Sequence, residues 1–203
     1  MSFEVDVAKR IGEAEIRCAF SSGPGLTALF GTSGSGKTSL LNMVAGLLRP
    51  DAGHIAVAGE TLFGNGADLP PEARRAGYVF QDRRLFPHLS VRANLAYGRR
   101  RDSALPELEQ TAAFLGIRDL LDRRPTTLSG GEAQRVAIGR ALLSGPRFLL
   151  MDEPLVALDR ARADEIMGLI ERIRDELRLP ILYVSHNPAE VERLATHVVQ
   201  LAR

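Results

Sequence analysis

The chain has 203 residues, enough to bury one substantial core without requiring more than one compact domain. Its formal net charge is +1, so no global field attracts nucleic acid or an anionic membrane. Cys18 is the only cysteine, which excludes an intramolecular disulfide, fits a reducing compartment and predicts a small buried hydrophobe at this position.

No apolar run in the sequence approaches the ~20 residues that span a bilayer. The segment Met1 to Asp6 combines neither a basic start nor an apolar stretch, so it does not resemble a secretory signal. We therefore expect a cytoplasmic protein that depends on another protein for any attachment to a membrane.

The pattern of apolar residues predicts strands of two kinds. Alternation over Phe3–Val7 is typical of a half-buried strand, and a second strand is expected over Ala14–Phe20, followed by a turn at Ser21–Gly25. Runs that are apolar on both faces suit parallel strands covered by helices. Four such runs are Leu26–Phe30, Tyr78–Phe80, Phe148–Met151 and Ile181–Val184.

Helical periodicity fills much of the remaining chain. One helix is expected from about Arg160 to Leu177, where apolar residues recur on one face. The stretch from Asp82 to Ser144 contains no convincing strand and predicts an inserted helical lobe. Its helices are expected near Ser90–Gly98, Pro106–Leu115 and Ser129–Leu143. The cluster Arg99–Arg101 reads most simply as a solvated loop, with a basic binding patch as the alternative.

Polar residues of special type directly follow each of the four apolar runs. Ligands of open parallel sheets bind beyond the carboxyl ends of the strands. Four distant segments are therefore expected to converge on one site. They are a glycine-rich loop after Phe30, Gln81 after Phe80, Asp152 and Glu153 after Met151, and Ser185 and His186 after Val184.

The glycine-rich loop has the pattern of a phosphate-binding loop. Its glycines let backbone N–H groups wrap phosphates, Lys37 brings a positive charge, and Thr38 offers a hydroxyl to Mg²⁺. A helix beginning near Lys37 points its positive end at the same anion. The alternative is a chance glycine-rich turn. The loop consists of Gly31, Thr32, Ser33, Gly34, Ser35, Gly36, Lys37 and Thr38.

The other strand-end residues suit hydrolysis of a nucleoside triphosphate. Asp152 can reach Mg²⁺ through a water, and Glu153 can accept a proton from the attacking water. The alternative is that both carboxylates cap the next helix. Gln81 suits a metal ligand or a group that orients water, and His186 suits a contact with the γ-phosphate, although each alone could be an ordinary loop residue.

Ser129–Glu132 fits the Ser-x-x-Glu capping box at a helix start. A capped start with two glycines also exposes N–H groups and a positive dipole end, which favours an anion. The chain would then hold two helix starts that bind phosphate, at Lys37 and at Ser129. The sequence leaves open whether they meet within one subunit.

These motifs, in this order, resemble the nucleotide-binding subunits of ATP-binding cassette transporters over essentially the whole chain. The matching segments are Walker A at Gly31–Thr38, the Q-loop at Gln81, the signature at Leu128–Gln134, Walker B at Phe148–Asp152 with Glu153, the D-loop at Ala157–Asp159 and the switch His186. The resemblance implies a P-loop NTPase of α/β class, with a mostly parallel sheet core and an N-terminal antiparallel part. It also implies one nucleotide-binding domain over residues 1–203, with a helical subdomain inserted at about 82–145.

The resemblance also implies an ATPase that uses Mg²⁺ and works as a head-to-tail pair of identical copies. Glu153, His186 and Gln81 would be catalytic, and Thr38, Gln81 and Asp152 would hold the metal. ATP would bind Gly31 to Ser39 of one copy. Residues of the other copy would contact the same ATP in trans, namely Ser129, Gly130, Gly131, Gln134 and Asp159.

A closer likeness to the ATPases of molybdate importers lies at Gly77–Leu89, with agreement at Val136–Leu143 and Leu182–His186. It implies a peripheral subunit on the cytoplasmic face of the inner membrane, paired with two integral permease subunits and, indirectly, a periplasmic oxyanion-binding protein. The cargo would be molybdate or tungstate, with sulfate, polyamine, sugar and iron importers as alternatives. Leu85–Pro87 would lie near a permease helix, or else pack in the lobe.

Two features depart from the family. No aromatic residue lies in Lys9–Gly12 to stack on adenine, so base selectivity is expected to be loose. Molybdate importer ATPases usually carry a C-terminal regulatory domain, whereas this sequence ends at Arg203, which fits either a shortened chain or a naturally short subunit.

Two other functions are alternatives to transport. A cassette ATPase of DNA repair would carry long coiled coils between its Walker motifs, and a ribosomal one would carry two cassettes. The near-neutral charge also opposes binding to nucleic acid. A non-catalytic ATP-binding module is opposed by the intact Lys37, Asp152, Glu153 and His186.

Overall fold

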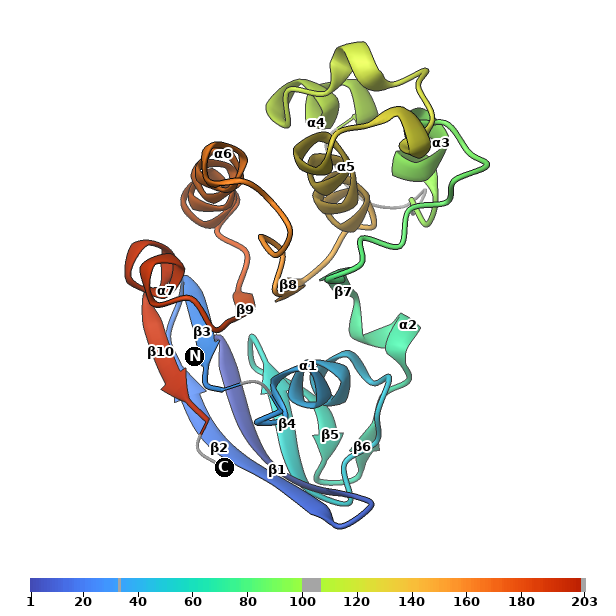
Figure 1. The fold of residues 1–203 in the computed structure, drawn as a ribbon. Coiled ribbons are helices and arrows are strands. Elements are labelled where there is room, and N and C mark those ends of the chain that lie inside the picture. The colour runs from blue at the N-terminus through green and yellow to red at the C-terminus, as the bar shows by residue number, and fades with distance from the viewer. Residues whose placement is uncertain (33, 100–106, 202–203) are drawn as a thin grey trace.

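An antiparallel sheet forms the N-terminal part of the chain in the computed structural model, which describes residues 1–32, 34–99 and 107–201 (Figure 1). The order of its strands is β2-β1-β4-β5-β6. Their bounds are Phe3–Ile11 for β1, Ala14–Ser22 for β2, Ala52–Val57 for β4, Glu60–Gly64 for β5 and Ala67–Asp68 for β6.

The first two strands are longer than predicted, because the hairpin pairs Ile11 with Ala14 across a turn in which Gly12 has a φ of 60°. Strands β4 to β6 were not located from the sequence. A Cβ atom on Gly53 would lie 1.9 Å from the carbonyl oxygen of Asp6, so only glycine allows β4 to approach β1 this closely.

A parallel sheet of order β10-β3-β9-β8-β7 forms the second layer. The four predicted apolar runs are neighbours in it, which confirms the parallel core, although β7 begins at Ala76 and Phe80 lies beyond its end. Nearly every residue of its three central strands is buried. The bounds are Leu26–Phe30 for β3, Ala76–Val79 for β7, Phe148–Asp152 for β8, Ile181–Ser185 for β9 and His197–Gln200 for β10.

Helix α1, Lys37–Ala45, packs between the two sheets. Alternation along β8 divides the core, because successive side chains of a strand point to opposite faces. Phe148 and Leu150 join the cluster around α1, and Leu149 and Met151 join the cluster that contains the later helices. The sheet is therefore covered on both faces, as its apolar strands require.

Arg74, in the short helix α2 (Pro71–Arg74), ties down the end of α1. Its side chain is 2% exposed and donates to the carbonyls of Met43 at 2.7 Å, Val44 at 3.1 Å and Leu69 at 2.7 Å. The carbonyls at the C-terminal end of a helix lack partners within the helix, and a guanidinium can satisfy several at once.

The helices between β7 and β8 form the lobe at the top of Figure 1. They confirm the three predicted helices, with Ser90 and Ser129 serving as N-caps and Pro106 lying outside the described residues. Residues 82–99 and 107–144, the described part of this stretch, contain no strand. The bounds are Val91–Ala96 for α3, Leu108–Phe114 for α4 and Gly130–Leu143 for α5, with 3₁₀ turns at Arg118–Leu120 and Pro125–Thr127.

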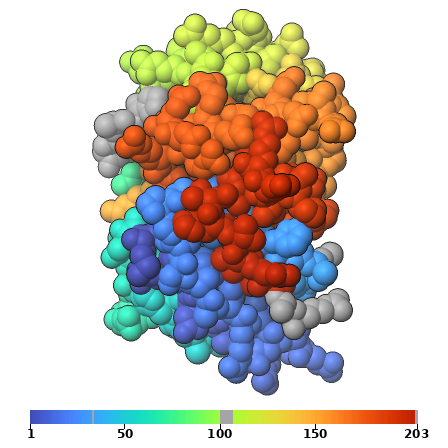
Figure 2. All heavy atoms as spheres, turned by 90° about the vertical axis from the view of Figure 1, so that its left-hand side faces the viewer, coloured from blue at the N-terminus to red at the C-terminus, as the bar shows by residue number. Residues whose placement is uncertain are grey.

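The C-terminal segment covers one side of the molecule. Helix α6 spans Arg160–Arg172 and continues as a π-helical turn over Ile173–Leu177, so the predicted helix is confirmed with an altered last turn. Helix α7 spans Pro188–Leu194. Figure 2 shows this orange and red surface reaching from the lobe to the blue N-terminal strands. Within the described ranges, no helix is both long and apolar enough to cross a bilayer.

Cys18 lies in β2, opposite Val7, and is 7% exposed. Burial raises the pKa of its thiol to about 11, and the charge of Asp6 adds to this shift. The prediction of a small buried hydrophobe is confirmed.

Candidate functional site

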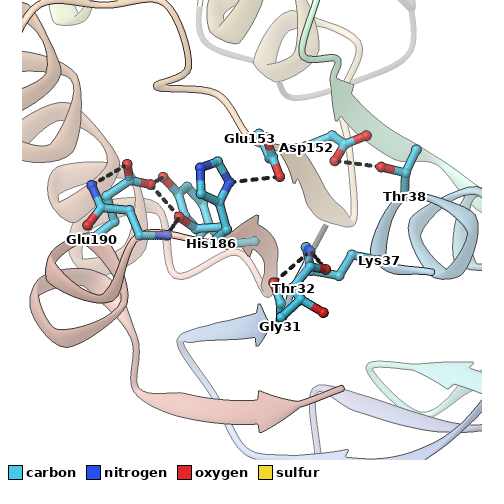
Figure 3. A network of polar contacts seen from close by, with 11 residues as sticks. Gly31, Thr32, Lys37, Thr38, Asp152, Glu153, His186 and Glu190 are labelled. Carbon is cyan, nitrogen blue, oxygen red and sulfur yellow. Dashed lines mark hydrogen bonds and ion pairs between the residues drawn. The ribbon is translucent and has the colours of Figure 1, made fainter. Parts of the chain in front are cut away.

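The carboxyl ends of three adjacent strands carry the predicted site residues. Strand β3 leads into the glycine-rich loop, β8 into Asp152 and Glu153, and β9 into Ser185 and His186. Figure 3 shows the loop, both carboxylates and the imidazole facing one region. The expected convergence of these three segments is therefore present within one chain.

The glycine-rich loop ends on an uncapped helix. Gly36 is the N-cap of α1 with a φ of 88°, and within residues 1–32, 34–99 and 107–201 no side chain caps this helix start. Those groups are free to face an anion, whose charge the helix dipole also favours. Gly34 also has a positive φ, of 80°, whereas Ser33 lies outside the described residues.

Lys37 is 5% exposed and folds back across the loop. Its Nζ donates to the carbonyl oxygens of Gly31 and Thr32, each at 2.8 Å (Figure 3). An ammonium group has three donors, so two hold the loop and the third can meet a phosphate oxygen. The loop and its lysine therefore fit a polyphosphate.

Thr38 and Asp152 form the oxygen-rich edge of the site. The hydroxyl of Thr38 donates to Oδ1 of Asp152 at 3.1 Å, and Asp152 is 4% exposed. Burial raises the pKa of Asp152 and the adjacent Glu153 charge adds to it, whereas the Thr38 hydrogen bond and the Lys37 charge oppose the shift. Thr38 and Asp152 line a cleft of about 780 Å³ together with Gln81.

These three residues fit Mg²⁺, which prefers oxygen ligands and usually keeps water and phosphate oxygens in its coordination shell. The described part of the chain holds no group of three His, Cys, Asp or Glu side chains that could bind a metal. An ion beside Thr38 and Asp152 would complete its shell from the nucleotide and from water. Gln81 is exposed at the junction of two clefts, one of which also contains the loop residues.

Glu153 and His186 meet across the ends of β8 and β9. Nδ1 of His186 lies 3.1 Å from Oε1 of Glu153, and the backbone N–H of Glu153 donates to the carbonyl of Val184 at 3.1 Å. Glu153 has a φ of 44°, a left-handed conformation that is uncommon outside glycine and that clusters at functional sites. The alternative that Asp152 and Glu153 cap the next helix is wrong, because Asp159 is the N-cap of α6.

A second cleft, of about 430 Å³, lies beside the glycine-rich loop and includes Glu153. The hairpin of β1 and β2 forms one wall of this cleft through Ile11, Ala14 and Ile16. These wall residues were not predicted. The sequence does contain an indication of this wall, because Ile11 and Ile16 lie on either side of the turn at Gly12, in the region that lacks an aromatic residue.

The capping box at Ser129 is confirmed. The N–H of Glu132 donates to Oγ of Ser129 at 3.3 Å, and the N–H of Ser129 donates to Oε2 of Glu132 at 2.7 Å. The bond from the Ser129 backbone N–H lowers the pKa of the Glu132 carboxyl most, and the nearby Ser129 hydroxyl lowers it further. Neither of the two clefts beside the glycine-rich loop is lined by residues 129–131. Among the described residues, the start of α5 therefore shares neither of these two clefts with the start of α1.

Gln134 is buried in the single chain, and its expected contact with ATP of another copy stays a prediction. It is 1% exposed, and its Oε1 accepts a hydrogen bond from Nε of Arg83 at 3.1 Å. The physical reason is its position on the inward stripe of α5, three residues after the buried Gly131. Asp159, by contrast, is largely exposed while it caps α6 through the N–H of Arg162 at 3.0 Å.

The segment after Gln81 is clamped to α5. The guanidinium of Arg140 donates to the carbonyls of Arg83 at 3.0 Å and Arg84 at 2.7 Å, and both of these residues have positive φ. Leu85 packs against the core, as its alternative interpretation expected, and the ring of Phe86 lies 4.4 Å from that of Tyr97. The face around Phe86 remains partly exposed.

Comparison with known proteins gives consistent sequence matches. The profile of a protein family described as ABC transporter matches residues 17–156. The molybdenum import ATP-binding protein ModC of Paramagnetospirillum magneticum is 58% identical over 200 residues, covering 95% of this chain and 54% of that protein. ModC of Rhizobium meliloti is 58% identical over 204 residues, covering 98% and 57%. The chain thus spans about half the length of these curated relatives.

Solved structures support the fold. The ATP-binding cassette MJ0796, in a dimeric post-hydrolysis state bound to ADP and Pi, matches with a TM-score of 0.78 and 26% identity over 99% of this chain and 94% of that one. The cbiO1 protein of Clostridium perfringens, part of the ABC transporter complex cbiONQ, matches with a TM-score of 0.84 and 26% identity over 98% and 84%. The predicted α/β cassette fold is confirmed.

Proposed function

The chain belongs to the ABC transporter family, and from this premise we propose that it is the ATP-hydrolysing subunit of an importer for molybdate or tungstate. The main observation in favour of ATP hydrolysis is the convergence of Lys37, the Thr38–Asp152 pair and the Glu153–His186 pair at adjacent strand ends. The similarity to relatives named as molybdenum import proteins supports molybdate or tungstate as the cargo.

The chain's own groups supply binding and proton transfer. Lys37 and the uncapped start of α1 bind the outer phosphates, and Ile11 and Ile16 form an apolar wall for the base. Glu153 accepts the proton of the attacking water while His186 orients that carboxylate and reaches toward the γ-phosphate. Bound Mg²⁺, held by Thr38, Gln81 and Asp152, would neutralise charge on the phosphate oxygens.

A second copy of the chain would complete each site. Ser129, Gly130 and Gly131 begin a helix whose positive end is not used within the chain's own nucleotide clefts, so they suit the phosphates bound by another copy. Asp159 is exposed near the same face and would connect the two sites. The dimeric state of a similar cassette supports this arrangement, which has two-fold symmetry.

The transport partners follow from the importer assignment. Residues 1–203 would act as one nucleotide-binding domain, with residues 82–145 as its helical subdomain on the cytoplasmic face of the membrane. Two permease subunits would contact the partly exposed segment around Phe86. A periplasmic oxyanion-binding protein would deliver the cargo without touching this chain, and no nucleic acid takes part.

Hydrolysis and cargo need separate tests. Wild-type chain should release phosphate from ATP only with Mg²⁺, and Lys37→Ala should abolish this; a wild type without turnover would refute the ATPase. The chain should then be reconstituted with the permease subunits of the same organism and a loaded binding protein. Molybdate should stimulate ATP hydrolysis. Stimulation by sulfate or a sugar instead of molybdate would contradict the proposed cargo.

A further inference from the structure

We infer that Glu190 is a positioning residue, which holds the turn Ser185–Asn187 so that the imidazole of His186 stays directed at Glu153. This inference rests on the proposed ATPase function and adds a residue to it. Glu190 lies in α7, outside the strand-end motifs, and its side chain contacts the residues on both sides of His186 (Figure 3).

Three donors converge on the Glu190 carboxylate. Oε2 accepts from the hydroxyl of Tyr183 at 2.7 Å and from Oγ of Ser185 at 2.8 Å. Oε1 accepts from Nδ2 of Asn187 at 3.2 Å. Two of these donors precede His186 in the chain and one follows it, so a single carboxylate fixes the backbone on either side of the imidazole.

The buried donors make this clamp stiff. Tyr183 is 0% exposed and lies in the middle of β9, and Ser185 is 3% exposed and ends this strand. Burial raises the pKa of Tyr183, and the nearby Glu190 adds to it, so the phenol stays protonated as a donor. Hydrogen bonds to an ionised acceptor are stronger than neutral ones.

Asn187 and Ser185 extend the clamp to the backbone of the turn. The N–H of Asn187 donates to Oγ of Ser185 at 3.0 Å, and Oδ1 of Asn187 accepts from the N–H of Ala189 at 3.0 Å. The amide of Asn187 is therefore fixed in orientation, with its NH₂ group toward Glu190. Glutamine at position 190 would replace one of the two acceptor oxygens by an NH₂ group. That group would face one of the three donors, or one donor would lose its acceptor.

His186 itself has little other support. Its side chain is 58% exposed, and the hydrogen bond recorded for its imidazole in the described ranges is the one to Glu153. The direction of the ring is consequently set by the backbone of the turn that Glu190 holds. Misplacement of a catalytic contact by about 1 Å can cost roughly 100-fold in rate.

The test compares Glu190→Gln with Glu192→Gln, a matched change of an exposed residue in the same helix. Glu190→Gln should lower kcat for ATP hydrolysis about 10-fold, with KM for ATP nearly unchanged. In a His186→Ala background the same change should have no further effect. An equal effect in both backgrounds, or an unchanged kcat, would overturn the inference.

A second measurement does not depend on activity. The imidazole ¹⁵N and ¹H signals of His186 in nucleotide-free protein should shift in Glu190→Gln and stay unchanged in Glu192→Gln. Tyr183→Phe, which removes one donor and keeps the ring, should give a smaller shift of the same kind if Glu190→Gln does not fold. Unchanged signals would refute the positioning role. Absent wild-type turnover would instead refute the ATPase, and the spectra would still decide the role of Glu190.

Discussion

The hydroxyl of Thr38 donates to Oδ1 of Asp152 over 3.1 Å and so joins the first turn of α1 to the end of β8. The two oxygens come from segments 114 positions apart, one on each side of the helical lobe. This pair is the most direct structural support for a Mg²⁺ site, because both oxygens are of the type that Mg²⁺ prefers.

Thr38→Val removes the hydroxyl and keeps the shape of the side chain. The Mg²⁺ concentration that gives half-maximal ATP hydrolysis should rise about 10-fold, because one ligand and the partner of Asp152 are both lost. A Mg²⁺ titration of phosphate release measures this. Thr127→Val, which removes an exposed hydroxyl that bonds the carbonyl of Arg124, serves as the control. An unchanged Mg²⁺ dependence would contradict the assignment.

Glu153→Gln keeps the size of the side chain and removes its basicity. Turnover should fall by about 10²–10⁴-fold, while ATP binding persists and two copies remain closed on the nucleotide. Phosphate release and light scattering with ATP measure the two effects. Glu165→Gln changes an exposed surface carboxylate and should leave both unaffected. Normal turnover in Glu153→Gln would remove this residue from the role of base.

Arg74→Met should destabilise the fold without touching the site. The substitution leaves the carbonyls of Met43, Val44 and Leu69 buried without their donor, at a cost of about 2–4 kcal/mol. Urea unfolding should show the lower midpoint at unchanged slope. Arg49→Met, at an exposed ion pair with Asp68, should cost less than about 1 kcal/mol. Equal losses in the two variants would show that the cap on α1 adds nothing.

Glu132→Gln tests the capping box through pH. The pKa of Glu132 is lower in the folded chain than its usual value of 4.5, so its charge stabilises the fold above that value. This stabilisation is lost as pH falls through the lowered pKa. The wild type should exceed Glu132→Gln in unfolding free energy by about 0.5–1 kcal/mol at pH 7, and the difference should shrink toward pH 3. A difference that does not vary with pH would indicate lost packing instead.

Ile11→Tyr should add the stacking surface that the base wall lacks. Ile11 is 45% exposed in the second cleft, so a ring can be accommodated there. An aromatic contact of about 0.5–1.5 kcal/mol corresponds to a roughly 2- to 10-fold gain in ATP affinity. Calorimetric titrations with ATP and with GTP measure the affinity of the variant and of the wild type for each nucleotide. Val198→Tyr places the same ring on exposed β10 as a control. An unchanged ATP affinity in Ile11→Tyr would indicate that the base binds at another part of the chain.

Much of the site was predictable because its signals are local. A few consecutive residues are enough to identify each motif: the phosphate-binding loop, the capping box and the carboxylate that follows an apolar run. Their convergence followed from one rule, that parallel strands present their carboxyl ends at the same edge. The positions of Asp152, Glu153 and His186 in space therefore needed no tertiary information beyond the pairing of β8 with β9.

The features that escaped prediction depend on distant partners. Strands β4 to β6 are short and include glycines, and β4 pairs with β1 some 50 positions earlier. Gln134 is polar, and only its contact with Arg83 shows why it is buried. The network around Glu190 likewise joins residues of β9, of the following turn and of α7, and no sequence motif marks this combination. Such relationships are set by packing, and pattern alone does not encode them.

The environment of Cys18 makes the chain well suited to distance measurements with attached probes. Thiols react as thiolates, and a buried thiol with a pKa of about 11 is scarcely ionised at neutral pH. A new cysteine at an exposed position outside the site, such as Glu192, would therefore be labelled selectively with the native sequence otherwise intact. Pairs of labelled chains could then report, by fluorescence or spin coupling, how far apart two copies lie before and after ATP is consumed.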